Sequence, residues 1–249
     1  MIHRATPKKI FGICCTAMTL AAIGCTSGPA VSPLEKTEDT EKTYPLPDKA
    51  IALSFDDGPS GLTEDILEVL SEQGIKATFF LIGENIRNQP SSAQKIFAQG
   101  HELGNHSNGY APLGGNTDPE VIRASLEGAS AALKGITGED PVFFRAPNVN
   151  YGENLSAVCA ELGLAIIGVS CWSQDWQESV TTEQLVANVL RDASDGAIIN
   201  CHELQKTLDG LPAVIHGLRE QGYEILSVGA LAARKNRTLE AGTQYDRLD

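Results

Sequence analysis

Short apolar runs alternate with helical patterns through most of this chain, and this alternation constrains its fold more than any other feature. Apolar runs between polar turns are candidate strands, and segments with apolar residues three or four positions apart are candidate helices. Strands that alternate with helices predict a parallel sheet covered by helices. The predicted strands span residues 50–55, 77–82, 102–105, 142–145, 165–169, 197–201 and 224–227.

Helical patterns fill most of the stretches between these strands. One of them begins at Asp118, a residue type that caps helices, followed by Pro119, which favours the first helical position. About seven strands joined in this way predict an α/β fold, a closed or nearly closed (β/α) barrel, with active residues at the carboxyl ends of the strands. The predicted helices span residues 63–73, 91–99, 118–134, 155–162, 182–192 and 211–221.

The composition favours one globular domain with an uncharged partner. The chain has 249 residues, 42% of them hydrophobic, which suffices for one core of ordinary size. Its net charge of −13 argues against nucleic acid, whose phosphates bind clustered Lys and Arg side chains. A neutral substrate suits this surface better, and we expect a monomer. Cys159, Cys171 and Cys201 form no C-x-x-C pair, so we expect them to be buried thiols.

The first residues predict export. Basic side chains precede an uncharged apolar run over 10–23, which is short for a membrane span and typical of a signal peptide. Small residues then lead into Cys25. This resembles a bacterial lipobox, so residues 1–24 are predicted to be a lipoprotein signal peptide and Cys25 the lipidated N-terminus. An ordinary signal peptide with a chance cysteine is the alternative.

Residues 25–48 are rich in Ser, Thr, Pro, Glu and Lys and poor in apolar side chains. Such a segment cannot bury enough surface to order itself, so we expect a flexible tether. The domain beyond it is then expected on the extracytoplasmic side of the bacterial membrane, to which it is held only through the lipid anchor at Cys25.

Polar residues follow five of the predicted strands. Asp56 and Asp57 come directly after the first, and because adjacent side chains point in different directions, one carboxylate can bind a cation while the other faces a substrate. Asp-Gly is also a common turn pair, so this motif alone is ambiguous. His106 offers an imidazole nitrogen that could share a divalent ion with Asp57, as in zinc sites. The remaining segments contain Arg145, Asp175 beside Trp176, and His202.

These five segments, in this order, resemble the polysaccharide deacetylase family, also called the NodB homology domain or carbohydrate esterase family four. The resemblance covers about residues 49–233 and leaves 234–249 as a C-terminal tail, which we expect to be solvated chain. It implies the distorted (β/α) barrel of that family. It also implies a divalent metal ion, with zinc expected and cobalt or another divalent ion as the alternative.

The resemblance assigns the proton-transfer groups. Asp56 is the expected general base, which takes a proton from the water that attacks the acetyl carbonyl beside the metal. His202 is the expected general acid, which protonates the leaving amine or alcohol. Arg145 is expected to hold the base by ion pairing, and Asp175 to orient and tune His202.

The resemblance also assigns the groups around the metal and the acetyl group. Asp57 and His106 are the expected metal ligands. Trp176 is expected to wall the acetate pocket, and a backbone N–H near Asn148 to stabilise the oxyanion. Asn148 and Asn200 are expected to bind substrate, although the family more often has Tyr at the first of these positions and Leu at the second.

Tyr110 occupies the position of the family's usual second metal-binding histidine. A neutral phenol, with an ordinary pKa of about 10, is a poor ligand. The site is therefore expected to hold its metal through Asp57, His106 and water, with Tyr110 as a conditional third ligand, and to bind it more weakly.

The segments 104–110 and 143–148 have the form seen in acetylxylan esterases of this family, G-N-H-S-x-x-Y and F-F-R-x-P-N. The leading hypothesis is therefore hydrolysis of O-acetyl groups on xylan. The alternative is N-deacetylation of peptidoglycan or chitin oligosaccharides, which needs the same catalytic groups. A second alternative, a glycan-binding domain without activity, follows from the missing histidine.

Overall fold

The computed structural model describes residues 47–149 and 151–249 of the chain. The predicted signal peptide, Cys25 and most of the predicted tether lie outside the described residues. Within them, no helix is both long enough and apolar enough to cross a membrane.

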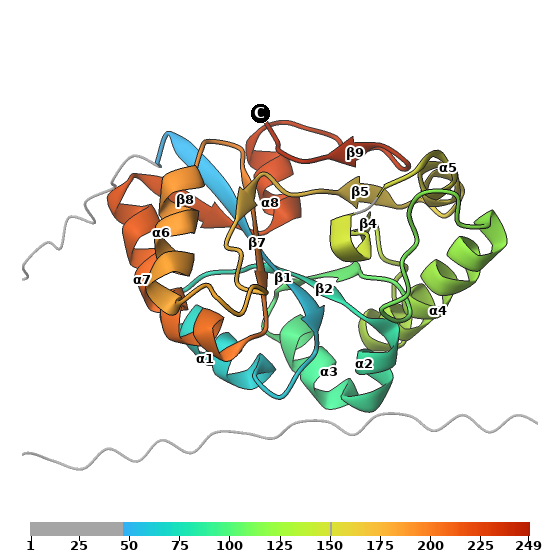
Figure 1. Cartoon of the computed structure of the whole chain (residues 1–249), viewed down its shortest axis with the longest axis horizontal. Coiled ribbons are helices and arrows are strands. Elements are labelled where there is room, and N and C mark those ends of the chain that lie inside the picture. Colours follow the sequence, from blue (N-terminus) through green and yellow to red (C-terminus); the bar gives the residue numbers. More distant parts are fainter. Residues whose placement is uncertain (1–46, 150) are drawn as a thin grey trace, which may run out of the picture. The chain divides into compact units, whose positions relative to one another are not determined.

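The described residues contain a nine-stranded sheet around which helices are arranged (Figure 1). The strand order is β6-β7-β1-β2-β3-β4-β5-β9, with β8 paired to β1 beside this path, and every strand pair is parallel. The strands are β1 (Lys49–Gly58), β2 (Thr78–Leu81), β3 (Glu102–Asn105), β4 (Phe143–Phe144), β5 (Ala165–Ile167), β6 (Cys171–Trp172), β7 (Ile198–His202), β8 (Tyr223–Leu226) and β9 (Gln244–Tyr245).

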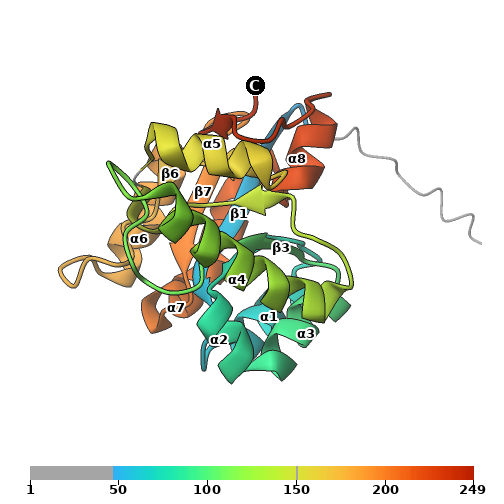
Figure 2. The same cartoon turned by 90° about the vertical axis from the view of Figure 1, so that its right-hand side faces the viewer.

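Helices cover the outer face of this curled sheet, except α8, which packs with Ala50 and Ala52 on the other face of β1. In Figure 1, α6 and α7 lie on one side and α4 and α5 on the other, and Figure 2 shows α4 and α5 next to each other. Their apolar sides face inward: in α1, Ile66, Leu67 and Leu70 are buried. The helices are α1 (Thr63–Glu72), α2 (Gly83–Asn88), α3 (Pro90–Ala98), α4 (Pro119–Thr137), α5 (Glu153–Glu161), α6 (Thr182–Asp192), α7 (Gln205–Glu220) and α8 (Val228–Arg234).

The two faces of β1 have different environments. Alternate side chains of a strand point to opposite faces. Ile51, Leu53 and Phe55 pack with residues of the outer helices in the largest hydrophobic cluster. Ala50 and Ala52 belong to a smaller cluster with residues of α8 and β5. The same alternation puts the polar residues Ser54 and Asp56 on this second face, at the carboxyl end of the strand.

The predicted barrel fold is confirmed, and all seven predicted strands are present; β3 has the predicted ends, and each of the other six is shifted at one end or both. The sheet has two further strands, β6 and β9, of only two residues each. Neither lies in an apolar run of strand length, unlike β4, which is equally short but belongs to the apolar run over 142–144. The short helices α2 and α8 were also not predicted.

The C-terminal residues differ from the solvated chain expected for 234–249. β9 pairs with β5, and Arg247 forms an antiparallel bridge with Ala197, just before β7. Leu248 is fully buried, and its N–H donates to the carbonyl of Gly196 at 2.7 Å. These residues therefore lie across the opening between β5 and β7 and complete the barrel wall. In the sequence, Leu248 lies between charged residues, so its burial in the barrel wall could not be expected from the local pattern.

Candidate active site

The end of β1 positions two adjacent carboxylates differently. The pairing of β1 with β2 shifts register between Asp56 and Gly58, and Asp57 between them has a left-handed backbone with φ of 69°. Asp56 is buried at 3% exposure, whereas the Asp57 side chain is 38% exposed. One carboxylate is thus held inside the barrel and the other faces a cleft.

Both oxygens of Asp56 accept a hydrogen bond. Arg145 Nη1 donates to Oδ1 at 2.7 Å, and Asn200 Nδ2 donates to Oδ2 at 2.7 Å. Burial raises the pKa of Asp56, but the charge of Arg145, the charge of His202 and the hydrogen bond from Arg145 oppose burial, and the pKa is lowered below its ordinary value. The carboxylate is therefore ionised at neutral pH, as a general base must be.

Arg145 is itself fully buried and fixed on every side. Its Nε donates to the carbonyl of Ile167 and its Nη2 to that of Gly168, both at 3.1 Å, and its guanidinium lies 4.1 Å from the centre of the Phe80 ring. Buried charge is costly unless it is paired and hydrogen-bonded, and here both conditions are met. Arg145 therefore ties Asp56 to the chain that follows β5.

His106 and Asp57 form a pair of metal-compatible donors. His106 Nδ1 lies 2.9 Å from the carbonyl oxygen of Arg145, and because that oxygen can only accept, Nδ1 carries the proton. Nε2 then presents its lone pair, 3.3 Å from Asp57 Oδ1. An imidazole nitrogen and a carboxylate oxygen converging in this way fit a divalent cation.

Tyr110 lies at the exposed rim beside this donor pair. It is 59% exposed and lines the same cleft. Asn85 Nδ2 donates to its hydroxyl at 3.4 Å and to the carbonyl of Asp57 at 2.7 Å. Across residues 47–149 and 151–249, no cluster of three His, Cys, Asp or Glu side chains could hold a metal ion. Any cation here has two such protein donors at most.

His202 faces Asp56 from the neighbouring strand. Its Nδ1 lies 2.7 Å from Asp175 Oδ1, while Asp175 Oδ2 accepts from the His202 backbone N–H at 2.6 Å and from the Thr207 hydroxyl at 2.7 Å. Burial lowers the pKa of His202, but the hydrogen bond and charge of Asp175 outweigh burial and raise it to about 9. The imidazole is therefore protonated at neutral pH and can act as an acid.

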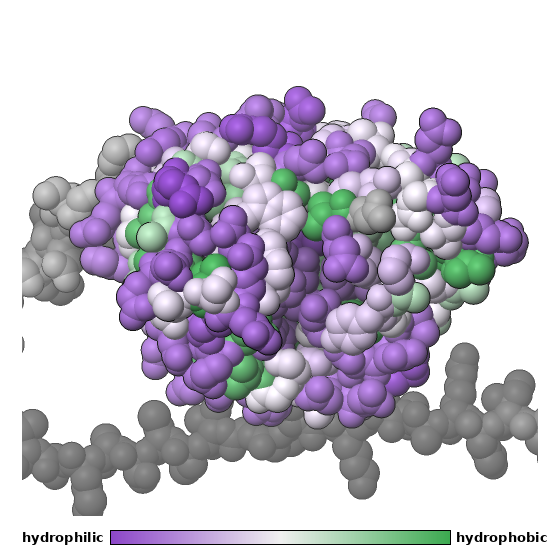
Figure 3. All heavy atoms as spheres, viewed as in Figure 1, coloured by the Kyte–Doolittle hydropathy of each residue, from purple (hydrophilic) through white to green (hydrophobic). Residues whose placement is uncertain are grey.

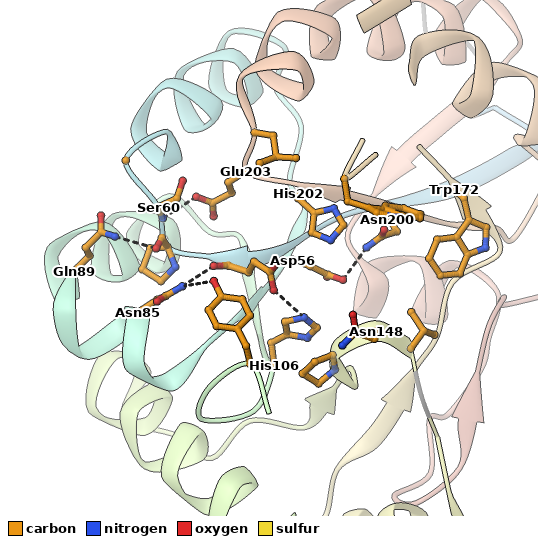
Figure 4. Close-up of a pocket in the computed structure, with 18 residues that line it drawn as sticks. Asp56, Ser60, Asn85, Gln89, His106, Asn148, Trp172, Asn200, His202 and Glu203 are labelled. Atoms are coloured by element: carbon orange, nitrogen blue, oxygen red, sulfur yellow. Dashed lines mark hydrogen bonds and ion pairs between the residues drawn. The ribbon is translucent and has the colours of Figure 1, made fainter. Parts of the chain in front are cut away.

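These groups surround a cleft of about 830 Å³. The face of the domain in Figure 3 is hollowed near its centre, and mostly hydrophilic residues surround the hollow. Figure 4 shows Asp56 between His202 and His106, with Asn148 next to His106 and Trp172 on the side of Asn200. The Trp176 ring, 46% exposed, meets His202 edge-on at 5.8 Å between ring centres. The cleft is far larger than an acetyl group and leaves room for sugar rings.

The structure brings together all ten residues that the sequence singled out for catalysis, metal binding and substrate binding. Arg145 and Asp175 lie behind the surface, in contact with Asp56 and His202. The other eight line the cleft: Asp56, Asp57, His106, Tyr110, Asn148, Trp176, Asn200 and His202.

Asn200 lines the cleft and also contacts the base. It is buried at 1% exposure and donates to Asp56 from within the wall of the cleft. Its Oδ1 has no hydrogen-bond partner among the described residues.

Several further residues of the cleft were not singled out from the sequence, among them Trp172, Asn85, Gln89 and Glu203. Trp172 belongs to a strand too short to be recognised, Asn85 lies within the unpredicted helix α2, and Gln89 is the residue that follows this helix. Only Glu203 could have been recognised from the sequence, because it directly follows the candidate acid His202. Burial raises its pKa, against hydrogen bonds from Thr63 and Ser60 that lower it.

Comparison with known proteins identifies the family. The family profile described as polysaccharide deacetylase matches residues 43–167 of the chain. The chain belongs to the polysaccharide deacetylase family. One relative is the bifunctional xylanase/deacetylase of Pseudobutyrivibrio xylanivorans, 36% identical over 191 residues, which are 75% of this chain and 31% of that protein. Another is the peptidoglycan-N-acetylglucosamine deacetylase PgdA of Listeria monocytogenes, 34% identical over 207 residues, which are 81% of this chain and 42% of that protein.

The chain thus spans less than half the length of these two relatives of the deacetylase family. One solved structure, in contrast, is matched over almost its whole length. The family 4 acetyl xylan esterase from Clostridium thermocellum, in complex with a cobalt ion, has a TM-score of 0.75 at 31% identity, over 80% of this chain and 99% of that one. The deacetylase barrel is therefore the fold of almost the whole described chain.

Proposed function

We propose that this domain is a metal-dependent carbohydrate deacetylase that hydrolyses O-acetyl groups of xylan. One observation carries the proposal: Asp56 and His202 are register partners on β1 and β7, and their surroundings hold one ionised and the other protonated. A base and an acid on one cleft are what acetyl hydrolysis needs. The family membership and the Asp57–His106 donor pair support the same reaction.

The residues of the chain divide the work as follows. When bound by Asp57 and His106, a divalent cation supplies Lewis-acid polarisation of the acetyl carbonyl and favours deprotonation of water. Asp56 accepts the proton of the attacking water. His202, with Nδ1 held by Asp175, donates the Nε2 proton to the leaving sugar oxygen as the bond to the acetyl carbon breaks.

The remaining cleft residues bind and orient the substrate. We assign Trp176 to the wall of the acetyl pocket and a backbone N–H near Asn148 to the developing oxyanion.

Zinc is the expected cation, with cobalt or another divalent ion as the alternative. Tyr110 is a third ligand only if its phenol turns toward the metal. Two protein donors imply weaker metal binding than three.

The choice of xylan as the substrate rests on the similarity of the chain to two relatives and on the motif forms of residues 104–110 and 143–148. The bifunctional xylanase/deacetylase and the acetyl xylan esterase are both among the relatives of the chain. An O-acetyl ester also has a better leaving group than an N-acetyl amide, so a weakly held cation suffices. PgdA is a specific reason to keep the second candidate, an N-deacetylase of peptidoglycan or chitin oligosaccharides.

We also propose that the protein is exported and anchored to the bacterial membrane through a lipid at Cys25, with the domain working as a monomer outside the cytoplasm. The support is the sequence pattern of residues 1–48. Replacing Cys25 with Ser should release the protein from the membrane fraction. Retention there would contradict the anchor.

Acetate release tests the function directly. The purified protein, loaded with zinc or cobalt, is compared on acetylated xylan, N-acetylglucosamine oligomers and peptidoglycan. Release from xylan supports the esterase, and release mainly from the N-acetylated substrates supports the second candidate. No release from any of them with metal present contradicts both and favours a glycan-binding domain without activity.

A further inference from the structure

The turn that carries Asp57 has an unfavourable backbone and is held by several bonds. A left-handed φ is uncommon for a residue other than glycine and persists only where the surroundings impose it. Asn85 Nδ2 donates to the carbonyl of Asp57 at 2.7 Å, and Gln89 Nε2 to that of Pro59 at 3.1 Å. The N–H of Ile82 donates to the carbonyl of Gly58 at 3.0 Å. All three bonds reach the turn from the β2–α2 side.

Glu203 holds the same turn from the opposite side. It follows His202 at the end of β7 and is buried at 6% exposure. Its Oε2 accepts from the Ser60 backbone N–H at 2.9 Å and from the Thr63 hydroxyl at 2.5 Å. Figure 4 shows this carboxylate reaching Ser60 from the strand that carries His202. Glu203, the residue after the proposed acid His202, is therefore hydrogen-bonded to the loop that follows the metal donor Asp57.

Glu203 also packs tightly against the turn backbone. A Cβ built on Gly58 would lie 2.0 Å from Glu203 Oε1, so only glycine leaves room for this carboxylate. Oε1 has no hydrogen-bond partner among the described residues. Burying a carboxylate oxygen without a partner costs free energy. Because Glu203 is buried at this cost next to the catalytic residues, its position indicates that it fixes the geometry of the turn.

We infer that Glu203 is a positioning residue, which holds the turn at Asp57 so that its carboxylate stays opposed to His106 Nε2 in the arrangement that binds the cation. The inference rests on the proposed function, because it concerns the same cation site. With only two protein donors, affinity depends strongly on how firmly each is held, since outer residues that orient ligands typically contribute 10- to 100-fold.

Glu102 provides a matched control at the other end of the barrel. Its Oε2 accepts from the Thr78 hydroxyl at 2.8 Å and from the Gly229 backbone N–H at 2.9 Å. It therefore makes the same two kinds of bond as Glu203, at the amino end of β3, away from the cleft. Loss of such bonds lowers stability in both places, but only one place adjoins the cation site.

The test compares Glu203→Ala, Glu203→Gln and Glu102→Ala with the unmodified protein. Each metal-free protein is titrated with Co²⁺, followed by its visible absorbance, and its melting temperature and kcat on an acetylated substrate are measured. We expect Glu203→Ala to weaken Co²⁺ binding by about 10- to 100-fold. Glu203→Gln, which keeps an oxygen for Ser60 and Thr63, should recover most of the affinity. Glu102→Ala should lower the melting temperature and leave Co²⁺ affinity within about twofold.

Equal Co²⁺ affinity in the two alanine variants would overturn the inference, as would an unmodified protein that binds no Co²⁺. If Glu203→Ala fails to fold, Glu203→Leu, which fills the space without accepting bonds, gives the same comparison. Absence of acetate release by the unmodified protein counts against the proposed function alone, because the ratio of Co²⁺ affinities still decides the role of Glu203.

Discussion

Asp56 and His202 are directly paired in the register of two parallel strands, and the structure shifts their protonation equilibria in opposite directions. The pKa of Asp56 is lowered because Arg145 and the charge of His202 outweigh burial, and the pKa of His202 is raised to about 9 because Asp175 outweighs burial. At neutral pH the site therefore holds a carboxylate opposite an imidazolium. Several predictions of activity and stability depend on this pair.

Replacing Asp56 with Asn should reduce kcat/KM by about 10²- to 10⁴-fold, the usual contribution of a general base. The substitution also leaves the buried Arg145 without its charge partner, which should cost about 3–5 kcal/mol of unfolding free energy. Acetate release and urea unfolding measure the two effects. Asp65→Asn, on the exposed side of α1, is the control. Unchanged turnover in Asp56→Asn would exclude Asp56 as the base.

Replacing Asp175 with Asn should move the alkaline limb of the kcat/KM profile to lower pH. Without the charge of Asp175, the pKa of His202 falls from about 9, so the acid loses its proton earlier. The exposed pair of His216 and Glu220 gives a matched control, because Glu220→Gln removes a carboxylate partner of a histidine outside the cleft. An unchanged alkaline limb in Asp175→Asn would contradict the assignment of His202 as the general acid.

The same pair predicts a pH dependence of stability. A histidine whose pKa is raised in the folded state stabilises the fold fully below its ordinary value of 6.5, and this contribution is lost as pH rises through about 9. Melting temperature should therefore fall between these pH values in the unmodified protein and fall less in Asp175→Asn. Equal pH profiles for the two proteins would contradict the pairing.

Replacing Asn200 with Leu should lower kcat and leave KM nearly unchanged. The amide donates to Asp56 from a buried position, so its loss disturbs the base rather than the bound sugar. An unpaired buried acceptor costs about 1–3 kcal/mol, and more when it is charged as Asp56 is, so the free energy of unfolding should fall as well. Steady-state kinetics on one acetylated substrate measure the split. A raised KM at constant kcat would return Asn200 to the substrate-binding residues.

Replacing Tyr110 with His should tighten binding of Co²⁺ or Zn²⁺, because an imidazole nitrogen would stand as a third protein donor at the rim beside Asp57 and His106. Tyr110→Phe, which removes only the hydroxyl, is the control and should bind the metal no more tightly than the unmodified protein. Titration of the metal-free proteins measures the affinities. Equal affinities for the His and Phe variants would place residue 110 out of reach of the cation.

Replacing Leu248 with Ala should lower the free energy of unfolding by about 2–5 kcal/mol, the usual cost of shortening a fully buried leucine. Val121→Ala, at a position of α4 that is 56% exposed, is the control and should have little effect. Urea unfolding measures both. A negligible effect of Leu248→Ala would return the C-terminal residues to the solvated chain expected from the sequence.

The sequence determined the local elements and the order of the polar motifs. Strand and helix periodicity depends on residues close together in the chain, so β1, β7 and α4 could be read directly from their side-chain patterns. The ends of parallel strands meet at one edge of a barrel, so the polar groups after those strands could be expected at a common site.

Only the tertiary structure decided which groups touch within that site. Asn200 and Asp56 are 144 positions apart, and Glu203 lies 143 positions from Ser60, so their contacts follow from the register of β1 against β7. The closure by Leu248 likewise depends on pairing with Gly196. Register and closure result from packing summed over the whole core, and no local pattern in the chain encodes that sum.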